Sequence, residues 1–295
     1  MSGTASFPAK VLLFGEYTVL FGGRALAIPA PRWSGRLVLD RSNDPDHRLS
    51  SWSEDMAEHR VWPEADLARF RKDVEAGLRF KSTIPEGYGL GSSGALSAAA
   101  FARYRSEAAN GNVTAMRDQL AAMESFFHGS SSGLDPLVSY LRKPVLREGD
   151  HYTTIDIPIK EAGAPCIFLV DSGRQRSTTE YVQLFKSQAL AEAFRQSVLS
   201  TMRSAADHAI AFLTEGHWDL FWDQVAALSQ LQLNRMQAFI PDVMADIWRS
   251  LDPQKICLKL CGAGGGGMFL GFARTPDAID RARQIPGYAE ISEPV

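Results

Sequence analysis

The stretch Glu86-Gly87-Tyr88-Gly89-Leu90-Gly91-Ser92-Ser93-Gly94-Ala95 leads directly into Leu96-Ser97-Ala98-Ala99-Ala100, so a glycine-rich loop opens an alanine-rich helix. Glycine lets the backbone wrap closely around an anion, while free N–H groups and the helix dipole supply positive potential without a fixed cation. The segment therefore predicts a phosphate-binding loop. The residues expected to contact a nucleotide are Gly89, Leu90, Gly91, Ser92, Ser93 and Gly94.

This loop departs from two common phosphate-binding patterns. No lysine follows its last glycine, as the Walker pattern requires, and no hydrophobic strand leads tightly into it, as in the dinucleotide fingerprint. A glycine and serine turn before a helix is also ordinary capping chemistry. The loop by itself therefore leaves phosphate binding and simple capping open.

The bulk composition favours small-molecule chemistry. With 295 residues, of which 45% are hydrophobic, the chain is long enough for two medium domains, which we expect at residues 1–163 and 164–295. The formal net charge of −3 gives no overall basic field, so neither nucleic acid nor a membrane is expected as a partner, and a homodimer is left open. The chain starts without a signal-peptide pattern and has no run of about 18 apolar residues, which predicts a soluble cytoplasmic protein.

The three cysteines do not suggest a disulfide framework, because their number is odd and the chain is long. Cys257 and Cys261 lie four residues apart in an alternating segment that predicts a strand, so both should point to one face. A metal site would need two further ligands nearby, and the sequence offers none. We expect buried structural thiols.

Hydrophobic spacing predicts alternating helices and strands along the whole chain. The segment 43–66 is polar, contains tryptophan and gives no clear pattern. The C-terminal half is expected to hold helices on a small, mostly antiparallel sheet. Helices are predicted at 67–80, 92–108, 113–127, 180–240 with a break near Gly216, and 275–283; strands are predicted at 10–13, 36–40, 166–170, 256–260, 268–272 and 288–291.

Three motifs occur together in a fixed order: Pro8 to Tyr17, the Gly-Leu-Gly-Ser-Ser loop at 89–93, and the glycine run at 262–267. In order and spacing they resemble the three signature motifs of the GHMP small-molecule kinases over most of the chain. The resemblance implies a two-domain α+β fold, with an N-terminal domain like the second domain of ribosomal protein S5 and a ferredoxin-like C-terminal domain. It also implies ATP as co-substrate.

Within that superfamily the chain resembles the mevalonate kinases. Glu124 precedes His128-Gly129-Ser130-Ser131-Ser132-Gly133-Leu134-Asp135, which is similar to the family's Glu, three residues, then His-Gly-x-Pro-Ser-Gly-x-Asp. Arg176-Ser177-Thr178 is similar to the family's Arg-x-Thr element. The activity implied is phosphorylation of a small-molecule alcohol, with mevalonate as the expected acceptor and 5-phosphomevalonate as the product of a step in isoprenoid biosynthesis.

The resemblance implies two catalytic residues. Asp135 would take the proton of the substrate hydroxyl, and Lys10 would lie beside it. A neighbouring ammonium favours the charged carboxylate and offsets charge on the transferring phosphoryl group. An isolated Ser-Gly-x-Asp is more often a turn or a helix cap, but the accompanying Glu124 and His128 favour the catalytic interpretation.

The same resemblance implies a Mg²⁺ site at Ser93 and Glu124, whose hard oxygen atoms suit that ion. A helix-capping serine and a surface glutamate are the alternatives. His128 could be only a helix C-cap, and the glycine run at 262–267 could be a flexible hairpin turn rather than a segment packed against the phosphate loop. The residues implied to line the acceptor pocket are Glu16, Phe127, His128, Ser132 and Thr178.

The chain departs from the mevalonate kinase pattern at three positions. Gly-Glu-Tyr, ending at Tyr17, replaces Gly-Glu-His and is more like phosphomevalonate kinase; Ser131 stands where the family has proline, and Gly94 where it has alanine. These changes leave the predicted chemistry intact. They put the acceptor in doubt.

Three other functions are compatible with parts of the sequence. A phosphomevalonate kinase would need cations for a second phosphate, which Arg174 and Arg176 could supply. A serine hydrolase is suggested by Gly129-Ser130-Ser131-Ser132-Gly133, which fits G-x-S-x-G, although the preceding pattern is helical where the nucleophile elbow needs a strand. A nucleotide-binding regulator without catalysis is disfavoured, because Lys10, Asp135 and Glu124 are all present.

Overall fold

The structure is a computed structural model, and it describes residues 5–40, 46–105, 112–158, 161–175 and 178–292. Contacts between Cα atoms group the chain into two compact units that are interleaved along the sequence. The division predicted between residues 163 and 164 stays a prediction. Unit 1 comprises Met1–Lys10, Ile28–Pro85 and Gly91–Val145; unit 2 comprises Val11–Ala27, Glu86–Leu90 and Leu146–Val295.

Both units combine helices with strands, which confirms the α+β class. The first sheet has five strands in the order β1-β2-β4-β5, with β3 also paired to β2. Two of these strands, β4 and β5, were not predicted, because four residues are too few to show a convincing alternation. The strands are β1 (Phe7–Phe14), β2 (Ala25–Leu39), β3 (Leu78–Ser82), β4 (Val145–Glu148) and β5 (His151–Thr154).

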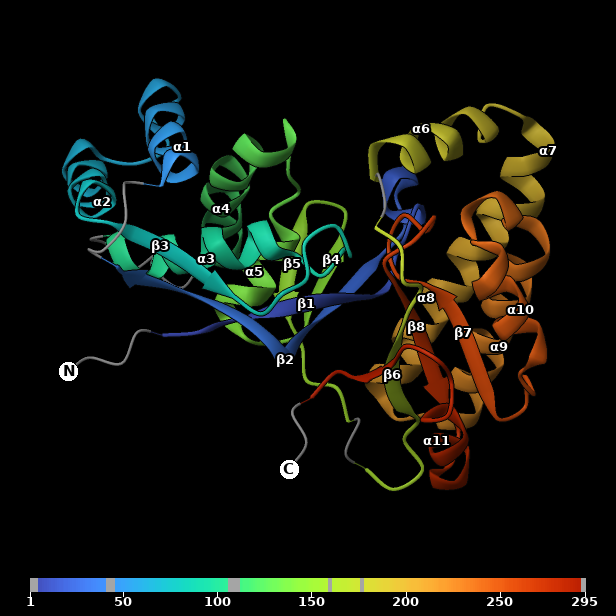
Figure 1. Cartoon of the computed structure of the whole chain (residues 1–295). Coiled ribbons are helices and arrows are strands. Elements are labelled where there is room, and N and C mark those ends of the chain that lie inside the picture. Colours follow the sequence, from blue (N-terminus) through green and yellow to red (C-terminus); the bar gives the residue numbers. More distant parts are fainter. Residues whose placement is uncertain (1–4, 41–45, 106–111, 159–160, 176–177, 293–295) are drawn as a thin grey trace. The chain divides into compact units, whose positions relative to one another are not determined.

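The helices of unit 1 include a group of three that pack on one another, α3, α4 and α5 (Figure 1). Helix α4 follows its prediction closely: Asn112 caps its start by accepting from the backbone N–H groups of Thr114 and Ala115, and Gly129 ends it with φ 74°. The unit 1 helices are α1 (His47–Glu58), α2 (Glu64–Glu75), α3 (Ser92–Tyr104), α4 (Val113–His128) and α5 (Leu134–Leu141).

The helix predicted at 67–80 was too long at its C-terminal end. Helix α2 ends at Glu75, Gly77 takes a positive φ of 90°, and Leu78 starts strand β3 opposite Leu39 of β2. The apolar spacing of Leu78 fits a helix as well as a strand, and only the pairing with β2 decides between them. Similarly, α3 ends at Tyr104 rather than near residue 108, and residues 106–111 lie outside the described residues.

Part of the segment without a clear pattern, 43–66, forms helix α1. Asp46 caps this helix by accepting from the N–H groups of Arg48 and Leu49. The apolar side chains of Leu49, Trp52 and Met56 are buried, and the indole N–H of Trp52 donates to the carbonyl of Met123 in α4 at 2.9 Å. Burial against α4 therefore stabilises a helix that the polar sequence did not reveal.

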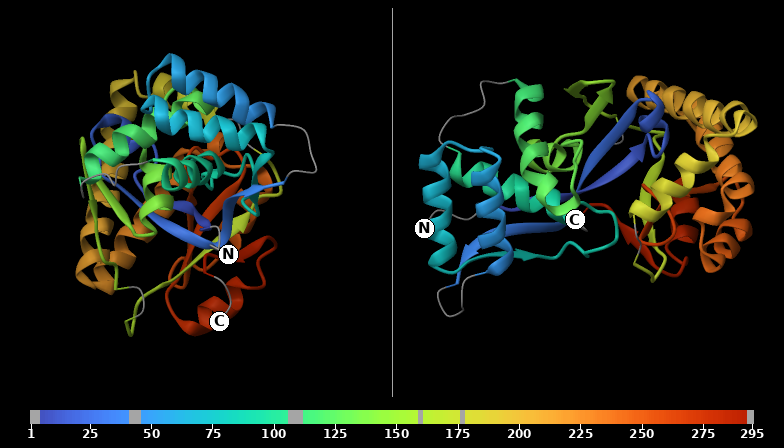
Figure 2. Two further views of the ribbon diagram at one scale, coloured as in Figure 1. Left: turned by 90° about the vertical axis from the view of Figure 1, so that its left-hand side faces the viewer. Right: turned by 90° about the horizontal axis from the view of Figure 1, so that it is seen from above.

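In unit 2 a four-stranded antiparallel sheet has the order β7-β8-β6-β9. All four strands were predicted, and these predictions are confirmed. Helices α8 and α9 lie side by side over one face of this sheet (Figure 2). The strands are β6 (Cys166–Asp171), β7 (Ile256–Leu260), β8 (Met268–Ala273) and β9 (Tyr288–Glu290); the helices are α6 (Thr178–Gln188), α7 (Glu192–Phe194), the π-helical turn Arg195–Leu199, α8 (Ser200–Glu215), α9 (Trp218–Arg235), α10 (Asp242–Ser250) and α11 (Pro276–Ala282), with short 3₁₀ turns at Thr18–Phe21 and Gln237–Phe239.

The glycine run between β7 and β8 is tightly packed and is not a loose hairpin. A Cβ atom on Gly265 would lie 1.9 Å from the ring of Tyr181, and one on Gly267 would lie 2.8 Å from the carbonyl oxygen of Tyr88. The N–H of Gly265 donates to the carbonyl of Phe239 at 2.7 Å, and that of Gly267 to Arg174 at 2.6 Å. Glycine is required here because its neighbours leave no room for a side chain.

The thiols of Cys257 and Cys261 are buried, as predicted, while Cys166 is exposed. None of the three cysteines forms a disulfide bond. Burial raises the pKa of the Cys257 thiol to about 12. Among the described helices, none combines the length and apolar character that a membrane crossing requires.

A charged pair is buried in the core of unit 2. The ammonium of Lys259 on β7 contacts Glu16 Oε1, and the two side chains are 0% and 2% exposed. Gln232 of α9 donates to the same carboxylate at 3.2 Å and accepts from the N–H of Leu260 at 2.8 Å. Such a pair is stable only while both charges are present, because either charge left alone in the interior is strongly disfavoured.

We expect Lys259→Met to lower the free energy of unfolding by about 3–5 kcal/mol, since it leaves the Glu16 carboxylate buried without a countercharge. The double variant Glu16→Gln/Lys259→Met should be more stable than the single one. Urea denaturation followed by circular dichroism measures both. Lys255→Met is the matched control, because Lys255 is half-exposed and lies 3.8 Å from Asp252; equal denaturation midpoints for Lys259→Met and Lys255→Met would contradict the assignment.

Candidate active site

The start of helix α3 lies over a charged pair in unit 1. Gly91 precedes the helix with φ 73°, and a Cβ atom there would lie 3.1 Å from Lys10 Cγ and 3.3 Å from Asp135 Oδ2. Glycine serves two purposes at this position, since the left-handed backbone and the close approach both disfavour a side chain. The predicted phosphate loop therefore ends directly on the predicted catalytic residues.

Lys10 and Asp135 form an ion pair. Lys10 Nζ lies 2.9 Å from Asp135 Oδ2, with side chains 10% and 31% exposed. Lys10 comes from strand β1, whereas Asp135 lies in the first turn of α5, where the helix dipole favours a negative charge. The structure thus brings together two residues that are 125 positions apart in the sequence.

Gly94 allows α3 to approach α5 closely. A Cβ atom on Gly94 would lie 2.9 Å from both the carbonyl carbon of Asp135 and the nitrogen of Pro136. Real Cβ atoms do not come so near to backbone atoms, so alanine at this position would move Asp135 or the helix. The departure from the family's alanine therefore has a local steric reason.

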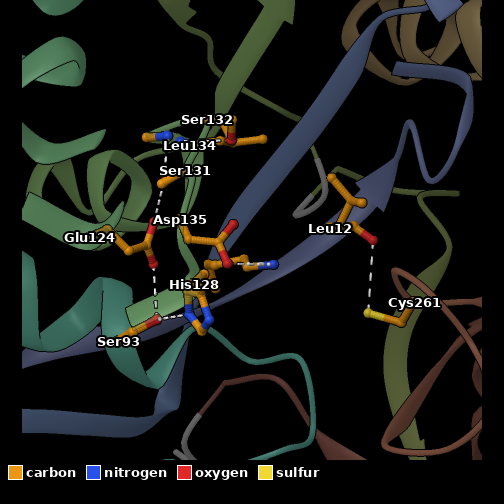
Figure 3. A network of polar contacts seen from close by, with 11 residues as sticks. Leu12, Ser93, Glu124, His128, Ser131, Ser132, Leu134, Asp135 and Cys261 are labelled. Carbon is orange, nitrogen blue, oxygen red and sulfur yellow. Dashed lines mark hydrogen bonds and ion pairs between the residues drawn. The ribbon is translucent and has the colours of Figure 1, made fainter. Parts of the chain in front are cut away.

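Glu124 is held by two hydroxyl groups, one on each carboxylate oxygen (Figure 3). Ser93 Oγ donates to Oε1 at 3.0 Å, and Ser131 Oγ donates to Oε2 at 2.5 Å. The residue is 5% exposed. A buried carboxylate with oriented oxygen atoms beside a predicted phosphate loop is a suitable ligand for a hard cation.

Burial and, to a smaller extent, the nearby charge of Asp135 raise the pKa of Glu124 to about 7. The hydrogen bonds from Ser131 and Ser93 and the charge of Lys10 act in the opposite direction. The physical cause is that the low-polarity surroundings and a second carboxylate both disfavour a negative charge. A bound cation would remove this penalty.

His128 lies one helical turn after Glu124, so both point to the same face of α4. Its Nε2 lies 2.9 Å from Ser93 Oγ. Because the only proton of this hydroxyl is used in the hydrogen bond to Glu124, Ser93 Oγ accepts a hydrogen bond from the histidine ring. Phe127 packs against Trp52, with ring centroids 5.1 Å apart, and lies under the guanidinium of Arg48.

The hydroxyl of Ser132 is close to the start of α5. It accepts from the N–H of Leu134 at 3.3 Å. Unit 1 therefore contains ten of the predicted site residues: Lys10, Gly91, Ser92, Ser93, Gly94, Glu124, Phe127, His128, Ser132 and Asp135.

No cluster of three His, Cys, Asp or Glu side chains occurs within the described parts of the chain. The described residues therefore do not form a group of three such side chains that could hold a metal ion by themselves. Mg²⁺ usually takes only one or two carboxylates and completes its shell with phosphates and water. The pair Glu124 and Ser93 fits that mode of binding.

Comparison with known proteins identifies relatives of this chain among the GHMP kinases. Residues 61–143 match the family model for the N-terminal domain of GHMP kinases. The mevalonate kinase of Archaeoglobus fulgidus is 28% identical over 274 residues, covering 90% of this chain and 91% of the relative. That of Pyrococcus abyssi is 25% identical, covering 91% and 88%. Residues 61–143 thus match the N-terminal domain of the GHMP kinases, and most of the chain is similar to mevalonate kinases.

Solved structures share the fold of this chain at low sequence identity. The mevalonate kinase of L. major in complex with R-mevalonate superposes with a TM-score of 0.67 at 18% identity, covering 95% of this chain and 90% of that one. The phosphomevalonate kinase of Streptococcus pneumoniae, in complex with phosphomevalonate and AMPPNP, gives 0.69 at 15% identity, covering 95% and 94%. The two-domain α+β fold implied by the motifs is confirmed.

Four predicted site residues belong to unit 2. Gly89 and Leu90 precede the boundary between the units, and Leu90 is buried. Glu16 is buried against Lys259, and Thr178 is exposed at the start of α6. Their predicted contacts with ATP and acceptor stay predictions. Arg176 and Ser177 of the Arg-x-Thr element lie outside the described residues.

The serine hydrolase alternative is wrong in its structural requirement. The segment 129–133 follows helix α4 rather than a strand, whereas the nucleophile elbow connects a strand to a helix. The central residue, Ser131, donates its proton to the carboxylate of Glu124 instead of facing a histidine base. The match to G-x-S-x-G is accidental.

The contact between Ser131 and Glu124 was not predicted from the sequence, in which Ser131 was noted only as a departure from the family's proline. The available signal was chemical: a hydroxyl replaces a residue that has neither a hydroxyl nor an N–H. Its partner could not be named, since only the fold of the turn after α4 brings Ser131 back to Glu124, seven residues earlier.

The raised pKa of Glu124 makes stability depend on pH in a defined direction. The folded state binds this proton more tightly than the unfolded chain, so the contribution is fully present below about pH 4.5 and lost as the pH rises through about 7. Glutamine stays neutral, so Glu124→Gln should gain stability relative to the wild type between pH 5 and pH 8, by up to about 3 kcal/mol.

Unfolding temperatures of both proteins at pH 5 and pH 8, measured in the presence of a chelator, test this expectation. Asp118→Asn serves as the control, because Asp118 is exposed on the same helix. A difference between Glu124→Gln and wild type that is identical at the two pH values would contradict the raised pKa.

Proposed function

We propose that this chain transfers the γ-phosphoryl group of ATP to the hydroxyl group of mevalonate, giving 5-phosphomevalonate and ADP in isoprenoid biosynthesis in the cytoplasm. The observation that carries the proposal is the Lys10–Asp135 ion pair directly beneath the N-terminus of helix α3. The similarity to mevalonate kinases over about nine-tenths of the chain supports the choice of acceptor.

The N-terminus of α3 is the proposed seat of the ATP phosphates. Its first N–H groups have no partner within the helix, and the dipole adds positive potential. Gly91 adds no side chain at this helix end, while Ser92 and Ser93 offer hydroxyl groups. A terminal phosphoryl group bound here would lie near Lys10.

Asp135 is the proposed general base. It accepts the proton of the acceptor hydroxyl while the alcohol oxygen forms a bond to the γ-phosphorus and the bond to the bridging oxygen of ADP breaks. Lys10 orients the carboxylate and offsets the negative charge that accumulates on the transferring group. Both residues act through positioning and charge, which dominate phosphoryl transfer.

Glu124 and Ser93 are the proposed Mg²⁺ ligands. When bound, this ion would offset the negative charge of the ATP phosphates and the charge that develops on the transferring group. The buried carboxylate and the adjacent hydroxyl, 3.0 Å apart, provide hard oxygen donors. His128, through its contact with Ser93, fixes the direction in which that hydroxyl points.

The acceptor is proposed to contact Ser132, His128 and Phe127 in unit 1, and Glu16 and Thr178 are proposed as further acceptor residues. Phosphomevalonate is the competing acceptor suggested by Tyr17. In the structure, however, Tyr17 is buried and stacks on Phe185 with ring centroids 4.1 Å apart, while its hydroxyl bonds to the carbonyl of Ala263. Its side chain is therefore used in packing, so we do not assign Tyr17 a contact with the acceptor.

Release of ADP, measured with equal concentrations of mevalonate, phosphomevalonate, homoserine and galactose, tests the proposed function. We expect turnover with mevalonate to exceed that with each other compound. Faster turnover with phosphomevalonate would reassign the acceptor. Absence of ADP release with all four compounds would reject the proposal.

Asp135→Ala should lower kcat by about 10² to 10⁴-fold and leave the affinity for ATP near its normal value, since the carboxylate acts on the acceptor proton and not on the nucleotide. Steady-state kinetics with mevalonate and a nucleotide-binding titration measure the two quantities. Asp118→Asn provides the control for a carboxylate removed from the same unit. A kcat of Asp135→Ala equal to that of wild type would remove Asp135 from catalysis.

A further inference from the structure

Ser131 connects two parts of the candidate active site through one hydroxyl group. It donates to Glu124 Oε2 at 2.5 Å and accepts from the backbone N–H of Gly133 at 2.9 Å. Gly133 is the residue that precedes helix α5, whose first turn carries Asp135. A single side chain therefore links the carboxylate on α4 to the turn that places the proposed base (Figure 3).

These hydrogen bonds determine the orientation of the Glu124 carboxylate. With Ser93 on Oε1 and Ser131 on Oε2, rotation of the carboxylate would break both contacts. Each oxygen keeps a second lone pair, which is available to another partner. Without Ser131, Oε2 would lack the only hydrogen-bond partner found for it among the described residues, and the group would be free to turn.

The turn itself is equally constrained. Gly133 has φ 74°, and a Cβ atom there would lie 2.6 Å from the carbonyl oxygen of Arg117. Its N–H is fixed by Ser131 and the next one, of Leu134, by Ser132. The two serines thus satisfy the first N–H groups at the start of α5.

We propose that Ser131 is a positioning residue for phosphoryl transfer, which aligns the Glu124 carboxylate for Mg²⁺ and fixes its distance from the turn that carries Asp135. The inference rests on the proposed kinase function. It concerns a position where the family's pattern has proline, and proline can make neither of the two hydrogen bonds. In this chain the Ser131 hydroxyl holds the Glu124 carboxylate directly by a hydrogen bond, which a proline ring could not do.

Partners that orient a metal ligand commonly change metal affinity by about tenfold or more when they are removed. For Ser131→Ala we therefore expect the Mg²⁺ concentration at half-maximal rate to rise about tenfold. We also expect kcat to fall while the KM for mevalonate stays within about twofold, since Ser131 does not touch the acceptor. Ser131→Thr keeps the hydroxyl and should restore both values.

A binding experiment without acceptor separates this inference from the proposed function. The affinity for AMPPNP is measured by calorimetry with saturating Mg²⁺ and again with a chelator. The dissociation constant with chelator, divided by the dissociation constant with Mg²⁺, reports the contribution of the ion. In Ser131→Ala this ratio should fall about tenfold relative to wild type, with the chelator value unchanged. Ser131→Thr should match wild type because it keeps the hydroxyl. The control Ser125→Ala should also match wild type, because the Ser125 hydroxyl donates to the carbonyl of Ala121 on the same helix.

An unchanged ratio in Ser131→Ala, or a wild type whose AMPPNP affinity does not respond to Mg²⁺, would overturn the inference. A wild type that shows the expected ratio but phosphorylates none of the four acceptors would reject the proposed function alone. Should Ser131→Ala fail to fold, Ser131→Cys takes its place, since a thiol keeps the size but is a weaker donor.

Discussion

The ion pair between Lys10 and Asp135 is the interaction on which the candidate active site depends. It joins a strand residue to a helix residue, with Lys10 Nζ 2.9 Å from Asp135 Oδ2, and the start of α3 packs closely against both residues. Gly91 and Gly94 remove the two Cβ atoms that would otherwise collide with Lys10, Asp135 and the start of α5. The glycines of the phosphate loop therefore have a second purpose besides leaving room for an anion. They set the distance between the helix dipole and the reacting groups.

Burial of Glu124 is the second constraint. A carboxylate with 5% exposure is unfavourable unless its oxygen atoms are satisfied, and two serines partly satisfy them. The remaining penalty is seen in its raised pKa, near 7. A cation bound at Glu124 would relieve this unfavourable negative charge, which couples cation binding to the ionisation of this residue.

The sequence predicted elements with a regular apolar spacing, and it missed elements that depend on strand pairing or on packing against another helix. Helix α4 and strands β7 and β8 were found, because their apolar spacing extends over several residues with glycine or an asparagine cap at their ends. Strand β3 was mistaken for the end of a helix, since the spacing of Leu78 fits both structures and the pairing with β2 is not visible in a local pattern. Helix α1 was missed because its stability comes from packing Trp52 against α4.

The sequence by itself determined which candidate residues the chain carries: three motifs in order and, through their resemblance to the GHMP kinases, a candidate base, an amine, a second carboxylate and a glycine loop. Only the tertiary structure decided how they meet. It placed Lys10 against Asp135, turned Ser131 back onto Glu124, and committed Glu16 and Tyr17 to buried contacts. The physical reason is that spacing specifies which face of an element a side chain occupies, whereas contacts between distant elements depend on how closely their backbones can approach. Here that approach is set by the absence of single Cβ atoms.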